Sequence, residues 1–234
     1  MLENYDVEAD VAIKFPKIWA NLIAGNQITA QAEPWAILLG GQPGAGKSFG
    51  SLEMSRRLDF NLLIINGDEF RPYHQFYHEI FQKYGKQAAK YTAEFAGKMV
   101  QRVRDEAISK RFNILIEGTF RTIETPLNEL NNFKQQGYKT AVLVCTCPKE
   151  TSWQSTLKRA EQQERSGIQP RYVDRAHFEL VVNNLAKNVE SVMKLGQPEH
   201  VEVYSRQGKL FDSHSMPMTQ LVSIINQELN RIEG

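Results

Sequence analysis

The chain has 234 residues, enough for one large domain or two small ones, and its 41% hydrophobic content is ordinary for a globular protein. Its 28 lysines and arginines balance 27 aspartates and glutamates, so no global charge points to nucleic acid or an anionic membrane as partner. No apolar run reaches the roughly 20 residues that span a bilayer, and the acidic start "MLENYDVEAD" lacks the order of a signal peptide.

The first half of the chain begins with helical pieces at 11–24, which have apolar positions three and four apart and an interruption near Pro16. Short apolar runs typical of strands buried on both faces of a parallel sheet then follow at 35–40, 60–67, 112–118 and 139–147. Longer segments with a helical pattern separate them, at 46–58, 90–110, 123–136, 149–166 and 172–195. This alternation predicts a doubly wound α/β fold around a mainly parallel sheet with helices on both faces.

The end of the chain has a different pattern. Residues 200–212 hold two β-patterned pieces around "RQGK", which predict a hairpin, and residues 219–232 predict an amphipathic helix that covers the core. We expect one domain over 1–234, with a helical N-terminal segment at about 1–33 and the hairpin and helix at about 200–234.

The two cysteines, Cys145 and Cys147, stand one residue apart and so share one face of a strand. This spacing is poor for a disulfide, and two sulfurs alone rarely hold a metal. They are interpreted as small buried residues in a reduced compartment, which predicts a cytoplasmic protein.

The stretch "GGQPGAGKSFG" matches G-x-x-x-x-G-K-[ST] and lies between an apolar strand and a helix, the context that this phosphate-binding motif requires. Glycines let several backbone N–H groups point at one anion, and the helix that starts here presents its positive end. We expect Lys47 to face solvent and to reach the β- and γ-phosphates of ATP, and Ser48 to coordinate Mg²⁺. The loop predicted to bind ATP comprises Gly41, Gln42, Pro43, Gly44, Ala45, Gly46, Lys47 and Ser48.

Carboxylates follow two of the other predicted strands, Asp68 after the run at 60–67 and Glu117 at the end of the run at 112–118. Ligands of open parallel sheets bind at the carboxyl ends of the strands, so both carboxylates are expected beside the glycine loop. A phosphotransferase needs a group that accepts the acceptor's proton, and Asp68 is a candidate. The alternative is that Asp68 caps a helix.

Positive charge for a migrating phosphoryl group is available in residues 157–175, which carry Arg159, Arg165, Arg171 and Arg175 around a "SGIQP" break. Such arginines grip phosphate oxygens in a lid, because the planar guanidinium fork matches them. The alternative is that each arginine is solvated or pairs with a nearby glutamate, such as Glu161 or Glu164.

The segments "LLGGQPGAGKS", "INGDEFRPYH", "ILIEGTFRTIETP" and "KRAE…QPRYVDRAH…VVNNLAKNVE" resemble the zeta-toxin family over about 35–212. The resemblance implies a glycine-loop kinase that transfers the ATP γ-phosphate to the 3′-hydroxyl of the sugar in UDP-N-acetylglucosamine, which blocks cell-wall synthesis. It also implies a small helical antitoxin partner that covers the ATP site. Matched positions imply Lys47 as the phosphate-binding lysine, Asp68 as general base, Arg159 and Arg171 at the transferring phosphate, and Glu117, Thr119 and Arg121 in the sugar-nucleotide pocket.

Two positions depart from the family pattern. Asn66 stands where the family has the first carboxylate of a D-x-D element, and Gln101 stands where some members place a glutamate that faces the sugar. Gln101 is kept among the expected substrate-binding residues. The segment before residue 33 carries no family motif, and we expect it to cover the sheet rather than to contact an antitoxin.

Other functions remain as alternatives. A kinase of another small molecule, such as an antibiotic or a nucleoside, would share the glycine loop and Asp68. An ATP-dependent switch is a second alternative, although the N-K-x-D element of guanine-specific switches does not occur in the sequence. A degenerate fold kept only for binding a partner is disfavoured, because Lys47, Ser48 and Asp68 are all intact.

Overall fold

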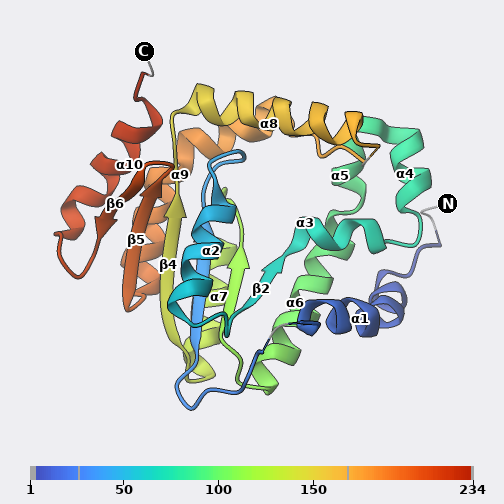
Figure 1. The fold of residues 1–234 in the computed structure, drawn as a ribbon, viewed down its shortest axis with the longest axis horizontal. Helices are drawn as coiled ribbons and strands as arrows, with labels where there is room; N and C mark the ends of the chain where they lie inside the picture. The colour runs from blue at the N-terminus through green and yellow to red at the C-terminus, as the bar shows by residue number, and fades with distance from the viewer. Residues whose placement is uncertain (1–3, 26, 168, 233–234) are drawn as a thin grey trace.

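The computed structural model describes residues 4–25, 27–167 and 169–232, which are built around one six-stranded sheet (Figure 1). The strand order is β2-β3-β1-β4-β5-β6, and every neighbouring pair is parallel except the antiparallel pair β5–β6. The strands are β1 (Trp35–Gly40), β2 (Leu63–Asn66), β3 (Ile114–Glu117), β4 (Lys139–Cys145), β5 (His200–Ser205) and β6 (Gly208–Asp212). The predicted α/β fold with a mainly parallel sheet is confirmed.

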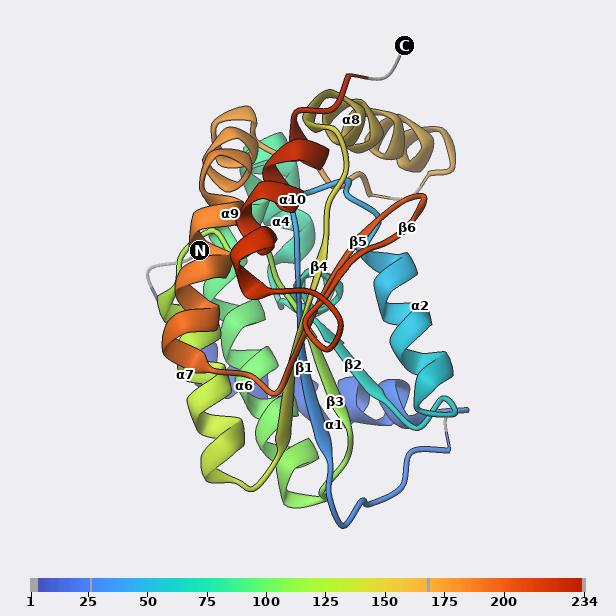
Figure 2. The same cartoon turned by 90° about the vertical axis from the view of Figure 1, so that its left-hand side faces the viewer.

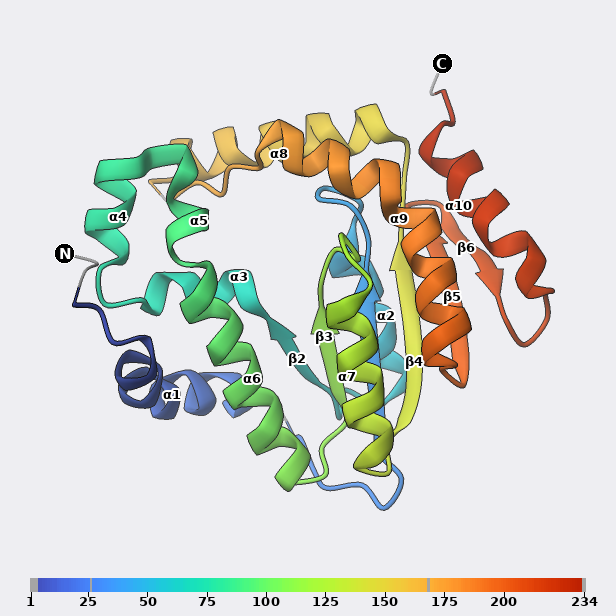
Figure 3. The ribbon, with the colours of Figure 1, turned by 180° about the vertical axis from the view of Figure 1, so that it is seen from behind.

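Helices cover both faces of this sheet: α2 lies against one face, and α6, α7 and α9 lie against the other (Figures 2 and 3). The longer helices are α1 (Val7–Ile23), α2 (Lys47–Arg57), α4 (Tyr77–Tyr84), α6 (Ala93–Ser109), α7 (Glu124–Gln135), α8 (Lys149–Arg165), α9 (Arg175–Gly196) and α10 (Leu221–Leu229). The short ones are α3 (Gly67–Phe70), η1 (Arg71–Tyr73), η2 (Gly85–Gln87), α5 (Ala88–Tyr91) and η3 (Met218–Gln220). No described helix is long and apolar enough to cross a membrane.

The alternating side chains of β1 divide the core into two layers. Ile37 and Leu39 pack into the cluster under α2, whereas Ala36 and Leu38 pack into the larger cluster on the opposite face. All four are buried, because both faces of a central parallel strand are covered by helices. The glycine loop that follows β1 therefore starts from the middle of the sheet, with a strand on either side.

The structure differs from the predictions made from the sequence at two places. Residues 11–24 were expected to be interrupted near Pro16, but α1 continues through that proline. Pro16 is exposed, while Val11 and Ile18 on either side of it are buried in the main core, so tertiary packing offsets the lost backbone hydrogen bond. The polar segment from 67 to 91, for which no helix was predicted, forms α3, η1, α4, η2 and α5.

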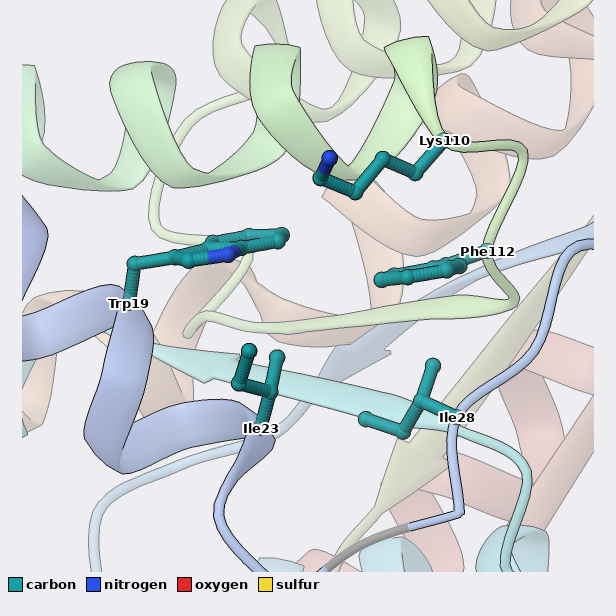
Figure 4. A pocket seen from close by; sticks show the side chains of 5 residues that line it. All are labelled: Trp19, Ile23, Ile28, Lys110 and Phe112. Carbon is teal, nitrogen blue, oxygen red and sulfur yellow. The ribbon is translucent and has the colours of Figure 1, made fainter.

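The N-terminal helix packs against α6 and the edge strand β2, which agrees with its expected role as a cover of the sheet. Where α1 ends, Trp19 and Phe112 lie with parallel rings 6.2 Å apart beside an open cavity of about 370 Å³ (Figure 4). Residues 1–3, 26, 168 and 233–234, which belong to the predicted domain of 1–234, lie outside the described residues.

Candidate functional site

The glycine loop connects the carboxyl end of β1 to the start of α2, and its glycines are required by close backbone contacts. Gly41, Gly44 and Gly46 all have positive φ angles, of 143°, 79° and 94°. A Cβ on Gly41 would lie 2.0 Å from the Cys145 carbonyl oxygen, and a Cβ on Gly44 would lie 2.2 Å from the Ser152 carbonyl oxygen. The loop therefore lies directly against β4 and α8, in a conformation that only glycine adopts without strain.

Gln42 anchors this loop to the segment that follows β4. Its side chain is fully buried, and Nε2 donates to the Cys147 carbonyl oxygen at 2.7 Å. Cys145 and Cys147 are buried thiols, as predicted, and Cys145 also packs under Gly50 of α2. Gln42 was predicted as a loop residue only from its position in the motif. Its hydrogen bond to Cys147 links the loop to the β4–α8 connection.

Lys47 does not face solvent, which corrects the expectation from the sequence. Its side chain is 12% exposed, and its ammonium donates to the carbonyl oxygens of Gly41 at 3.3 Å and Gln42 at 3.4 Å. Nζ also lies 3.8 Å from Oε1 of Glu117. Burial lowers the pKa of Lys47 from its ordinary value, against the attraction of Glu117. The ammonium folds back onto the loop because the nearest oxygens in the protein are there.

Asp68 lies in the first turn of α3, directly after β2, and its side chain is 56% exposed, so a bound molecule can reach it. Arg71 donates from Nε to Oδ1 of Asp68 at 2.8 Å. Desolvation raises the pKa of Asp68, but the charge and hydrogen bond of Arg71, together with the charges of Arg171 and Lys47, outweigh this effect, and the pKa lies below its ordinary value. Arg71 also donates to the Ala89 carbonyl oxygen at 2.6 Å and to Oγ1 of Thr92 at 3.0 Å, which fixes the guanidinium.

Asn66 links the two carboxylates that follow the strands. Its Oδ1 accepts from the backbone N–H of Asp68 at 3.1 Å as the N-cap of α3, and its Nδ2 donates to Oε2 of Glu117 at 3.3 Å. A carboxylate at this position could cap the helix but would repel Glu117. From the sequence, Asn66 was recognised only as the replacement of a family carboxylate, and neither Asn66 nor Arg71 was identified as a site residue. The i, i+3 spacing of Asp68 and Arg71 was the available signal.

Glu117 ends β3 beside an open cavity of about 320 Å³ that also reaches the exposed Ser48. Burial raises the pKa of Glu117 above its ordinary value, against the attraction of Lys47. Oxygen-bearing side chains therefore surround the start of α2, namely those of Ser48, Asn66, Glu69 and Glu117. Oxygen donors of this kind suit Mg²⁺, which prefers carboxylates, hydroxyls and water.

Arg159 lies on α8 and Arg171 on the connection between α8 and α9, and their charges act on the same carboxylates. Desolvation and the like charge of Arg171 lower the pKa of Arg159, while Asp68 and Glu117 act in the opposite direction. Arg171 in turn contributes to the low pKa of Asp68. Within the described residues, neither guanidinium forms an ion pair, whereas Arg175, on the first turn of α9, pairs with Glu179 at 2.8 Å. The structure thus brings together the charges of Arg159 and Arg171, but not that of Arg175.

The loop after β3, with Thr119 and Arg121, is fixed by α9. Asn188 donates from Nδ2 to the carbonyl oxygens of Phe120 at 2.9 Å and Arg121 at 2.8 Å. The Phe120 ring covers Gly40, where a Cβ would lie only 1.7 Å from the ring. Gln101 lies exposed on α6 and takes no part in these contacts.

A separate group of possible metal ligands lies at the opposite edge of the sheet, where His200, Asp212 and His214 place nitrogen and oxygen atoms within 4.8 Å of one another. The two imidazole rings are stacked 3.9 Å apart and parallel to within 1°, so their in-plane lone pairs do not converge on one point. Asp212 already accepts from Lys209 at 2.7 Å. This arrangement is a satisfied side-chain network rather than an ion site.

A glycine loop follows the central strand β1, carboxylates stand at the end of β3 and after β2, and arginines lie on α8 and on the α8–α9 connection. Together they define a P-loop kinase-like site. The chain belongs to the zeta toxin family, whose members are kinases: the Zeta toxin family matches residues 20–215. It is 38% identical over 175 residues to toxin PezT of Streptococcus pneumoniae, covering 74% of this chain and 69% of that protein. It is 31% identical over 204 residues to toxin zeta of Streptococcus agalactiae, covering 86% and 71%.

Solved structures agree with this assignment. A structure from the PezAT chromosomal toxin–antitoxin system of Streptococcus pneumoniae aligns with a TM-score of 0.86 at 29% identity, covering 100% of this chain and 92% of that one. The AvrRxo1-ORF1:-ORF2 complex aligns with a TM-score of 0.60 at 12% identity, covering 95% and 73%, which shows a shared fold.

Proposed function

We propose that this protein transfers the γ-phosphate of ATP to the 3′-hydroxyl of the sugar in UDP-N-acetylglucosamine, and so blocks cell-wall synthesis. The observation that carries the proposal is the convergence of Lys47, Asp68 and Glu117 at the carboxyl ends of adjacent strands. Membership of a kinase family supports the reaction class, and the matching "IEGTFR" segment supports the acceptor.

The donor side fits ATP because the glycine loop leaves no room for side chains on its inner turns and begins a helix at Lys47. Phosphate oxygens would replace the carbonyl oxygens that Lys47 now contacts. The Ser48 hydroxyl would hold Mg²⁺, with Glu117 close enough to take part. When bound, Mg²⁺ supplies neutralising charge at the β- and γ-phosphates.

The acceptor side centres on Asp68. Its low pKa keeps the carboxylate ionised at neutral pH, so it can orient the acceptor hydroxyl and take its proton. As the hydroxyl oxygen bonds to the γ-phosphorus, the bond from that phosphorus to the β–γ bridging oxygen breaks and ADP leaves. Glu117, Thr119, Arg121 and Gln101 would contact the sugar nucleotide, with the loop after β3 held in place by Asn188.

Arg159 and Arg171 would meet the charge that spreads over the phosphoryl oxygens in the transition state. Their charges reach Asp68 and Glu117, and within the described part of the chain neither side chain is committed to a carboxylate in an ion pair. Two guanidinium groups close together repel each other until an anion lies between them, so they favour the state with most negative charge.

We also propose a small helical antitoxin as the partner that covers the ATP site. One solved relative comes from a toxin–antitoxin system, and this supports such a partner for the present chain. Co-purification with a helical protein encoded beside this one, and loss of ATP binding in the complex, would test the pairing.

The acceptor is tested by mass spectrometry of UDP-sugars, nucleosides and aminoglycosides incubated separately with the protein and Mg-ATP, with Asp68→Asn as the matched inactive control. A gain of one phosphate on UDP-N-acetylglucosamine is expected, and mapping of its position should place it on the 3′-hydroxyl of the sugar. Phosphate on a nucleoside or an antibiotic instead would identify a kinase of another small molecule. ATP hydrolysis without a phosphorylated acceptor would favour a switch.

A further inference from the structure

The turn between β5 and β6 lies at the carboxyl end of the parallel strands, the same end as the glycine loop, since β5 is parallel to β4. Arg206 stands in this turn. The turn is shaped by Ser205, whose Oγ accepts from the Gln207 N–H at 3.0 Å, and by Gly208, whose φ is 142°. The hairpin is joined to the segment after β4 by the Thr146 N–H, which donates to the Tyr204 carbonyl oxygen at 2.8 Å. These hydrogen bonds fix the backbone of the turn that carries Arg206.

Arg206 reaches back over the glycine loop and contacts two other elements. Its Nη2 donates to the carbonyl oxygen of Gly44 at 2.5 Å and to Oγ of Ser155 at 2.7 Å. Its stem lies over Gly46, where an added Cβ would be 3.7 Å from the Arg206 Cγ. Gly44 and Gly46 belong to the glycine loop, and Ser155 belongs to α8.

The contact with Gly44 completes the anchoring of one peptide group. The N–H on the other side of that peptide, of Ala45, donates to the Gln42 carbonyl oxygen at 3.1 Å. The peptide between Gly44 and Ala45 is thus held at both its oxygen and its nitrogen. Its orientation sets the direction in which the following loop N–H groups point, and these are the groups that bind phosphate in a loop of this kind.

The contact with Ser155 ties the loop to the helix that carries an arginine of the site. Ser155 precedes Arg159 on α8 by four residues, about one helical turn. Arg206 therefore fixes both the loop that would hold the donor phosphates and the part of α8 from which Arg159 extends.

We propose that Arg206 is a positioning residue for the nucleotide: it holds the glycine loop in its phosphate-binding conformation and sets α8 against that loop. The inference rests on the proposed function in one respect only, that the glycine loop binds ATP. An ordinary surface arginine pairs with a carboxylate or with water and contributes little. Among the described residues Arg206 has no carboxylate partner and instead binds a backbone carbonyl of the loop itself.

Binding of a non-hydrolysable ATP analogue with Mg²⁺ to the full chain, measured by calorimetry, tests the proposal. Arg206→Ala should raise the Kd about tenfold, because a charged hydrogen bond is lost at a loop that must stay ordered. Arg206→Lys should recover part of the loss, since lysine keeps the charge but loses the fork. Arg56→Ala, which removes an exposed arginine from α2, is the matched control and should bind as the wild type does.

Two further measurements separate positioning from mere stability. In steady-state kinetics Arg206→Ala should raise the KM for ATP and leave the KM for the acceptor unchanged, with a thermal unfolding temperature close to that of wild type. Ser155→Ala should weaken ATP binding less, and the double variant should lose less than the product of the two single effects, because the two residues share a contact.

Wild-type affinity for the analogue in both Arg206 variants would overturn the proposal. So would equal increases in the KM for ATP and for the acceptor. If Arg206→Ala does not fold, Arg206→Lys decides in the same assay. Failure of the proposed function is distinguishable: a different acceptor leaves the ATP measurements intact, whereas a wild-type protein that binds no nucleotide overturns both proposals.

Discussion

The glycine loop and the arginines above it are built in opposite ways. In the loop, Gln42, Gly44 and Lys47 are all engaged by neighbouring groups of the protein. Above the loop, the like charge of Arg171 contributes to the lowered pKa of Arg159, and among the described residues neither arginine pairs with a carboxylate. The loop is thus held in place by the protein itself, whereas the opposing positive charges lie in an unfavourable arrangement that a bound anion would relieve. Under the proposed function, this difference separates groups that would hold ATP from groups that would act on the transferring phosphate.

The largest effect is expected between these two regions, at Asp68. Asp68→Asn should lower kcat by about 10² to 10⁴, because the amide cannot accept the acceptor's proton. ATP binding should be retained, since Asp68 lies outside the glycine loop. Rapid-quench measurement of phosphate transfer, beside calorimetric ATP binding, checks both parts. Full activity in this variant would leave Asp68 as a helix residue only and move the search for the base to Glu117.

On the donor side, Lys47→Ala should lower kcat/KM by about 10² to 10³, the usual loss for one preorganised cation or donor at a developing charge. The helical circular-dichroism signal should stay, because within the described residues the ammonium of Lys47 contacts only loop carbonyls and Glu117. Lys47→Arg is the control for charge. A collapse of the helical signal would show that Lys47 is structural.

On the opposite side, Arg159→Lys and Arg171→Lys should each lower kcat by about tenfold or more, since lysine keeps the charge but loses the planar fork. The change should appear in kcat more than in KM, as expected for contacts made in the transition state. Arg165→Lys, at the exposed end of α8, is the internal control and should be nearly silent. Steady-state kinetics with saturating acceptor distinguishes these outcomes, and three silent variants would exclude the lid role.

The smallest effect is a change in pH dependence at Arg71. Burial raises the pKa of Asp68, and Arg71 is the main group that lowers it, so Arg71→Gln should raise that pKa. Protonation then removes the base at a higher pH, and the activity of the variant relative to wild type should fall as the pH decreases from neutral towards about 4, the ordinary pKa of an aspartate. Arg71→Lys keeps the charge and should keep the wild-type profile. Parallel pH profiles for Arg71→Gln and wild type would contradict the assigned pairing.

The sequence predicted the parts of this fold that follow from hydrophobic patterning. The runs at 35–40 and 139–147 form β1 and β4, because short aliphatic runs between glycines and polar helices suit a buried parallel sheet. The pattern failed for 67–91, whose short helices depend on contacts such as that of Arg71 with Thr92 rather than on an apolar stripe. It also failed at Pro16, where packing on both sides outweighs a local preference.

The sequence predicted the motif residues of the candidate site but not the residues that hold them in place. Lys47, Asp68 and Glu117 follow strands, and strand ends meet at one edge, so their proximity could be inferred. Asn188 and Arg206 support the site through backbone carbonyl oxygens distant in sequence, and Asn66 does so through the side chain of Glu117. No local pattern marks such contacts. The folding of Lys47 back onto its own loop was not predicted either.

The contact between Gly40 and Phe120 has a consequence for how relatives of this chain can diverge. A methyl group at position 40 would lie 1.7 Å from the Phe120 ring, and Phe120 has a positive φ of 51° between Thr119 and Arg121. A substitution at either position therefore displaces the other, and with it the loop predicted to recognise the acceptor. Positions 40 and 120 should covary across the family: lineages that gain alanine at the first should carry a small residue at the second. Where both change together, acceptor preference is expected to drift as well.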